Sequence, residues 1–155
     1  MKPLIIGFGN PLCSDDGVGW HAAEYLRTSY GPAQARVIAA HQLGPEMAED
    51  VARASVVIFI DAEQGKPPGE VASRTLQPRS EAPRTFTHHL SPATLIACSR
   101  LLFRAAPPAF LVTVGASEFA AGEKLTAPVA SALPRVAREV EHLLAGLPAA
   151  RPASH

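Results

Sequence analysis

The chain has 155 residues, enough for one domain that buries well over half of the surface its unfolded form exposes. Lysine and arginine together number 14, as do aspartate and glutamate, so there is no global positive field to bind nucleic acid or an anionic membrane. The two cysteines, Cys13 and Cys98, have neither the spacing of a zinc site nor that of a disulfide framework.

Short apolar runs rich in valine and isoleucine alternate with stretches of helical period, the pattern of a layered α/β domain. The runs predict strands at 3–8, 36–40, 56–60, 71–76 and 110–114. The first, third and fifth of these are apolar on both faces, which is typical of strands in the middle of a sheet covered by helices on both sides. The strand at 71–76 alternates and contains Arg74, which favours an edge position and antiparallel pairing.

Helical periodicity predicts helices at 18–30, 45–53, 92–103 and 128–144. Ser91 before Pro92 has the pattern of an N-cap followed by a first-turn proline, and Pro134 predicts a kink or a break in the last helix. We expect a single domain over 1–147 and a frayed tail over 148–155. The N-terminus has no signal-peptide pattern and no apolar run is long enough for a membrane span, so we expect a cytoplasmic protein.

The first loop, within IIGFGNPLCSDDGVGWHAAEYL at residues 5–26, follows a strand as a nucleotide-binding loop would. The GxGxxG fingerprint fails because Leu12 takes the sixth position and Pro11 removes a backbone donor. Asp15 and Asp16 stand where a phosphate cradle should be electropositive. They are either capping carboxylates or functional residues, and capping explains one aspartate better than two.

Two further segments carry candidate functional residues. Asp61 follows the strand at 56–60 and should share a rim with the first loop if the two strands are neighbours. His88 and His89 end the irregular segment 77–90, just before the capped helix. One imidazole and two carboxylates would suit a divalent ion such as nickel, zinc, manganese or iron. The histidines at 21, 41, 142 and 155 are interpreted as structural, although His41 starts a loop where it could touch a bound partner.

Four collinear segments carry a resemblance: GFGNPLCSDDGVG, IFIDAEQGKPPGE, THHLSPATL and VTVGASEFAAGEKLTAPVASALPRV. In this order, over residues 4 to 144, they resemble the hydrogenase maturation proteases. The resemblance implies a three-layer α/β/α sandwich, phosphorylase/hydrolase-like, with a mixed and mostly parallel five-stranded sheet. It also implies an endopeptidase that removes the C-terminal extension of a nickel-iron hydrogenase large-subunit precursor after nickel insertion.

The same resemblance implies roles for individual residues. The metal-binding trio of the family matches Asp16, Asp61 and His88, with nickel presented by the substrate. The two aspartates are the candidate catalytic residues, with either a carboxylate as general base on water or the ion polarising the scissile carbonyl. Further candidate substrate contacts are Gly9, Asn10, Asp15, Gln42 and His89, the last of which is also an alternative ligand to His88.

Two other functions are weighed against this one. A binding module or chaperone that recognises the nickel-loaded large subunit without cutting it would use the same trio. A peptidyl-tRNA hydrolase also begins GFGNP, but the segment CSDDGVGWHA lacks the Thr-Arg-His-Asn run and with it the catalytic histidine of that family, and the chain lacks a basic surface for tRNA. We expect a monomer, since the enzyme must admit a large folded substrate.

Overall fold

A five-stranded sheet in the order β2-β1-β3-β5-β4 forms the middle layer of the computed structural model, which describes residues 1–77 and 90–146. The pairs β1–β2, β1–β3 and β3–β5 are parallel, and β4 pairs antiparallel with β5. The mixed, mostly parallel sheet that the sequence predicts is therefore confirmed. The strand bounds are Leu4–Phe8 (β1), Arg36–Ala40 (β2), Val57–Glu63 (β3), Val71–Leu76 (β4) and Ala109–Gly115 (β5).

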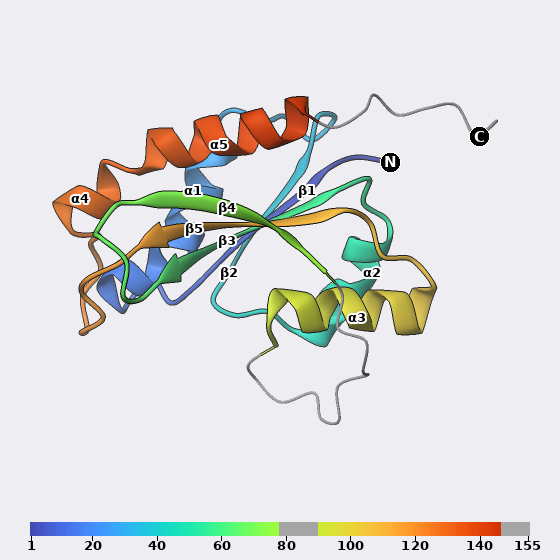
Figure 1. Ribbon diagram of the computed structural model, residues 1–155, viewed down its shortest axis with the longest axis horizontal. Helices are drawn as coiled ribbons and strands as arrows, with labels where there is room; N and C mark the ends of the chain where they lie inside the picture. Colours follow the sequence, from blue (N-terminus) through green and yellow to red (C-terminus); the bar gives the residue numbers. More distant parts are fainter. Residues whose placement is uncertain (78–89, 147–155) are drawn as a thin grey trace.

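Helices cover both faces of this sheet (Figure 1). One face carries α1 (Val18–Leu26), α4 (Ala127–Ala130) and α5 (Leu133–Ala145), and the other carries α2 (Ala48–Ala52) and α3 (Pro92–Phe103). Two 3₁₀ turns lead into helices: η1 (Ser14–Gly17) precedes α1, and η2 (Pro45–Met47) precedes α2. Of the helices in the described ranges, none combines the length and apolar character needed to cross a membrane.

The core has two halves, one on each side of the sheet, because successive strand residues point to opposite faces. Ile6 and Phe59 pack with α2 and α3, whereas Ile5, Ile58 and Ile60 pack with α1, α4 and α5. Every one of these side chains is fully buried. The central strands β1, β3 and β5 are thus apolar on both faces, as predicted, and β4 is the mostly exposed edge strand.

Helix ends differ from the predictions in three places. α1 stops at Leu26, because the amides of Thr28 and Ser29 bond three residues back, to Tyr25 and Leu26, in a tighter turn. The predicted helix at 45–53 begins as a 3₁₀ turn before becoming α-helical. The predicted break in the last helix is confirmed, but it falls at Ser131 and Ala132, and Pro134 lies in the first turn of α5, where no amide donor is needed.

Candidate active site

A cleft of about 790 Å³ opens at the carboxyl ends of three neighbouring strands, β2, β1 and β3. Parallel strands bring their following residues to one edge of the sheet, so segments far apart in sequence meet there. The register of β1 and β3 ends at Gly7 opposite Ile60, which places Asp61 just beyond the pairing. The lining residues are Phe8, Gly9, Asn10, Asp16, His41, Gln42, Leu43, Asp61, Leu90, Ser91 and Pro92.

The glycines of the first loop allow a helix to approach the sheet closely. A Cβ on Gly19 would lie 2.3 Å from the carbonyl oxygens of both Phe8 and Ile60, so the start of α1 touches β1 and β3 directly. Gly9 has a φ of +145°, and a Cβ there would lie 2.0 Å from the Asp16 carbonyl oxygen. This close packing, which only glycine allows, places Asp16 directly beside the strand ends. A nucleotide-binding protein would have its phosphate-binding loop at this position.

Asp15 is predicted from the sequence to contact the substrate. In the structure its side chain is fully buried and does not line the cleft. Its carboxylate accepts the backbone N–H of Thr126 at 2.8 Å and that of Glu118 at 3.1 Å. The backbone N–H and hydroxyl of Ser117 also donate to it, at 3.2 and 3.4 Å. Burial raises the pKa of Asp15, but these hydrogen bonds, led by that of Thr126, outweigh it, and the pKa is lowered.

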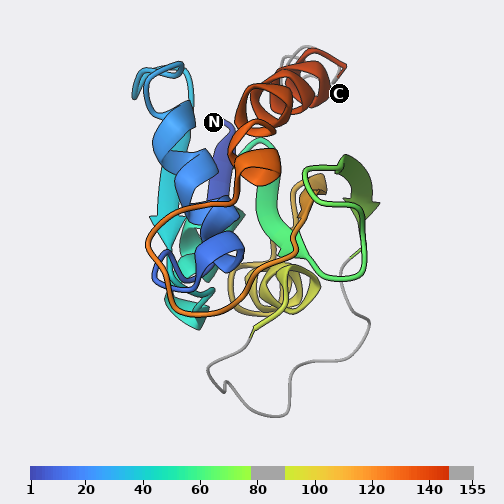
Figure 2. The same ribbon diagram turned by 90° about the vertical axis from the view of Figure 1, so that its left-hand side faces the viewer.

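This hydrogen bonding fastens the segment between β5 and α4 to the first loop. Figure 2 shows the segment, in orange, crossing in front of the blue start of α1. Further bonds join the two: the Ser14 amide donates to the Gly122 carbonyl at 2.9 Å, and the Gly122 amide donates to the Leu12 carbonyl at 2.9 Å. Asp15 therefore holds the loop that presents Asp16.

Asp16 turns the other way and lines the cleft. One of its carboxylate oxygens accepts the Asn10 backbone N–H at 3.0 Å. The Asn10 side-chain oxygen in turn accepts the Leu12 N–H at 2.9 Å, which closes the turn around Pro11. A 3₁₀ turn separates adjacent side chains by about 120°, so one aspartate serves the fold and its neighbour faces the cleft.

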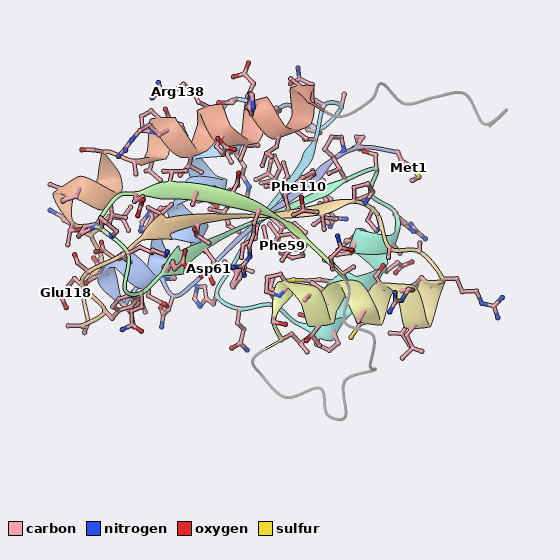
Figure 3. The ribbon with its side chains drawn as sticks, viewed as in Figure 1. Met1, Phe59, Asp61, Phe110, Glu118 and Arg138 are labelled. Atoms are coloured by element: carbon pink, nitrogen blue, oxygen red, sulfur yellow. The ribbon has the colours of Figure 1, made fainter. Side chains whose placement is uncertain are left out.

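Asp61 lies inside β3, near the carboxyl end of the strand (Figure 3), rather than just after the strand as predicted. The strand extends to Glu63 because it pairs with β5, where Asp61 is opposite Thr113. Burial raises the pKa of Asp61 to about 7, the charges of Asp16 and Glu63 adding to the effect and the Ala62 N–H at 2.8 Å opposing it. A carboxyl group with this pKa exchanges protons readily near neutrality.

The predicted histidines, His88 and His89, lie outside the described residues. Within 1–77 and 90–146, no group of three or more histidine, cysteine, aspartate or glutamate side chains could hold a metal ion. Gly9, Asn10 and Gln42 line the cleft, and their contact with a substrate stays a prediction. The cleft also contains His41, interpreted from the sequence as structural but noted at the start of a loop where it could touch a bound partner. Its place after β2 becomes informative only once β2 is known to lie beside β1.

A scan against protein-family models found no match, and neither did a search of curated proteins. Several solved structures resemble the chain over nearly its whole length, and three of them are as follows. The hydrogenase maturating endopeptidase HybD from E. coli is 25% identical, with a TM-score of 0.74 over 94% of this chain and 93% of that one. The solution structure of an endopeptidase from Escherichia coli is also 25% identical, with a TM-score of 0.72 over 95% of both chains.

The third structure is the [NiFe] hydrogenase maturation protease HycI from Thermococcus kodakarensis KOD1. It is 18% identical, with a TM-score of 0.74 over 94% of this chain and 93% of that one, and shows the shared fold. Together with the cleft, the likenesses at 25% identity define the class of protein as a peptidase of the α/β type. The chain is thus similar in fold and sequence to the hydrogenase maturation proteases, and its role is that of a processing protease.

Proposed function

We propose that this protease removes the C-terminal extension of a nickel-iron hydrogenase large-subunit precursor, and does so only after nickel has been inserted. The observation that carries the proposal is the meeting of Asp16 and Asp61 in one cleft at the end of the central strands. Both come from segments that carry the family resemblance. The nickel belongs to the substrate, and the protease recognises it as part of that substrate.

The chemistry of the two carboxylates supports a cationic guest. The charge on Asp16 contributes to the raised pKa of Asp61, so the ionised pair is unfavourable by itself. A divalent ion between them would relieve this repulsion and take the place of a proton. Carboxylate oxygens are suitable ligands for such an ion, and an imidazole from His88 would complete the donor set. A phosphate group would instead add a third negative charge to the cleft.

In this proposal, Asp16, Asp61 and His88 contact the nickel of the precursor and hold the adjacent peptide segment in the cleft. When bound, the ion supplies charge stabilisation at the scissile carbonyl. Asp61 or Asp16 accepts a proton from the attacking water. Gly9, Asn10 and Gln42 form the walls against which the peptide lies.

The direct test is the mass of the large subunit after incubation with the purified protease. Wild-type protein should shorten the nickel-loaded precursor and leave the nickel-free precursor intact, and Asp61→Asn should shorten neither. Asp50→Asn is the matched control, because Asp50 pairs with Arg36 outside the cleft, and this variant should cut normally. Binding to the loaded precursor without any loss of mass would instead support the binding-module alternative.

A further inference from the structure

His41 occupies a fixed position in the cleft wall. It directly follows β2, and the Ala40 carbonyl accepts the Gly9 N–H at 3.0 Å, which ties this end of β2 to the first loop. On its other side, Leu43 is only 2% exposed and anchors the chain in the core. Between these anchors His41 itself is exposed and lines the same cleft as Asp16 and Asp61. Its imidazole is therefore available to a bound substrate at a defined place.

The imidazole reaches the cleft from a different segment of the chain than either carboxylate. His41, Asp16 and Asp61 do not form one of the three-residue groups that could hold a metal ion, none of which occurs in the described part of the chain. The cleft thus has one carboxylate from η1, one from β3, and an imidazole just after the end of β2. A volume of about 790 Å³ leaves room for a peptide segment to lie between them.

Peptide hydrolysis requires two proton transfers at two places. A base must remove a proton from water, and an acid must protonate the nitrogen that leaves, because an amide anion is a very poor leaving group. The carboxylates of the cleft can serve the first transfer. Histidine is the side chain best suited to the second, because it holds and releases a proton in the physiological pH range.

We propose that His41 is the general acid that protonates the leaving nitrogen of the scissile bond, an inference that rests on the proposed peptidase function. A water molecule gives one proton to a cleft carboxylate as its oxygen bonds to the carbonyl carbon. The C–N bond breaks, its electron pair goes to nitrogen, and the His41 imidazolium supplies the proton that nitrogen needs. The carboxylic acid returns its proton to the imidazole through solvent, so the net reaction adds one water.

The test compares two leaving groups under single-turnover conditions with the nickel-loaded precursor. In one substrate the scissile bond is the natural amide, and in the other, made by semisynthesis, it is a thioester. A thiolate leaves without protonation, so loss of a general acid should slow only the amide. We expect His41→Gln to cut the amide about 100-fold more slowly or worse, and to cut the thioester within about threefold of the wild-type rate.

His142→Gln provides the matched control, because His142 is exposed on α5 and lies outside the cleft. It should cut both substrates at the wild-type rate. An equal loss on amide and thioester would overturn the acid role of His41 in favour of substrate binding, and an unchanged amide rate would overturn any catalytic role. Wild-type protein that cuts neither loaded substrate would overturn the proposed function itself.

Discussion

Asp16 and Asp61 face one cleft from two different segments, and the charge of the first helps to raise the pKa of the second. Burial is the larger cause, and together the effects bring the pKa of Asp61 to about 7. Two neighbouring carboxylates, one of them largely buried, lower the stability of a folded protein. Such pairs are typical of sites whose reaction requires a group with a shifted pKa. The pair is the physical basis of the predictions that concern function.

Replacing Asp61 with asparagine should stabilise the protein at alkaline pH while abolishing processing. An ordinary aspartate ionises near 3.8, and Asp61 in the folded state near 7, so between these values only the folded state holds the proton. The stability of the wild type therefore falls as pH rises through this window. We expect Asp61→Asn to exceed the wild type by about 1 to 4 kcal/mol at pH 8, with little difference near pH 4.

Urea unfolding at a series of pH values measures this difference. Asp50→Asn, which removes a surface carboxylate, should follow the wild-type pH dependence. A stability of Asp61→Asn that runs parallel to that of the wild type from pH 4 to 8 would contradict the raised pKa of Asp61.

Asp15 should show the opposite behaviour. Its carboxylate is buried and accepts several hydrogen bonds from the segment at 117–126, so Asp15→Asn should lower the free energy of unfolding by about 2 to 4 kcal/mol at pH 7. Because the pKa of Asp15 is lowered, its contribution is present above pH 3.8 and is lost as pH falls through the folded-state pKa. The loss in the variant should therefore shrink in acid, and a loss below about 0.5 kcal/mol at pH 7 would rule out the anchoring role.

The close approach of α1 to the sheet is tested by Gly19→Ala. The added methyl group would meet two carbonyl oxygens at 2.3 Å, and backbone on both sides leaves it little room to move. We expect a loss of about 2 kcal/mol or more in urea unfolding. Gly31→Ala is the control, because the nearest atom to its new methyl group is a side-chain oxygen 3.7 Å away. Equal stabilities of the two variants would show that α1 does not touch the strands.

The choice between His88 and His89 as the third ligand is open to a direct comparison. The family resemblance matches His88 to the ligand position, so His88→Ala should reduce processing of the nickel-loaded precursor by about 10-fold or more. His89→Ala should have a smaller effect, and His155→Ala, in the C-terminal tail, should have none. Cleavage assayed by mass gives the order of the variants. A larger loss of processing for His89→Ala than for His88→Ala would assign the ligand position to His89 instead.

The strand order could be predicted in outline, because strands that are apolar on both faces must lie in the centre of a sheet. The end of β3 could not, since Asp61 to Glu63 are held by partners in β5 that are close only in the fold. Local sequence also could not separate Asp15 from Asp16. The hydrogen-bond partners that bury Asp15 are more than 100 residues away in the chain, whereas the partner of Asp16 is six residues away.

His41, the proposed general acid, shows the same limit. A histidine after a short, partly buried strand has no local feature that distinguishes it from a surface residue. Its importance follows from the position of β2 beside β1, which brings the residue to the mouth of the cleft. Composition and periodicity predict the layers of the fold, and the strand order decides which side chains share the site.

X-ray absorption at the nickel edge tests most directly whether the protease contacts the substrate's metal. Mixing the nickel-loaded precursor with His41→Gln protein, which should bind but cut slowly, should add oxygen or nitrogen scattering to the nickel first shell. The same protein also carrying Asp16→Asn, Asp61→Asn and His88→Ala should leave the spectrum unchanged. An unaltered nickel spectrum in a complex that wild-type protein goes on to cleave would contradict recognition of the ion by these carboxylates.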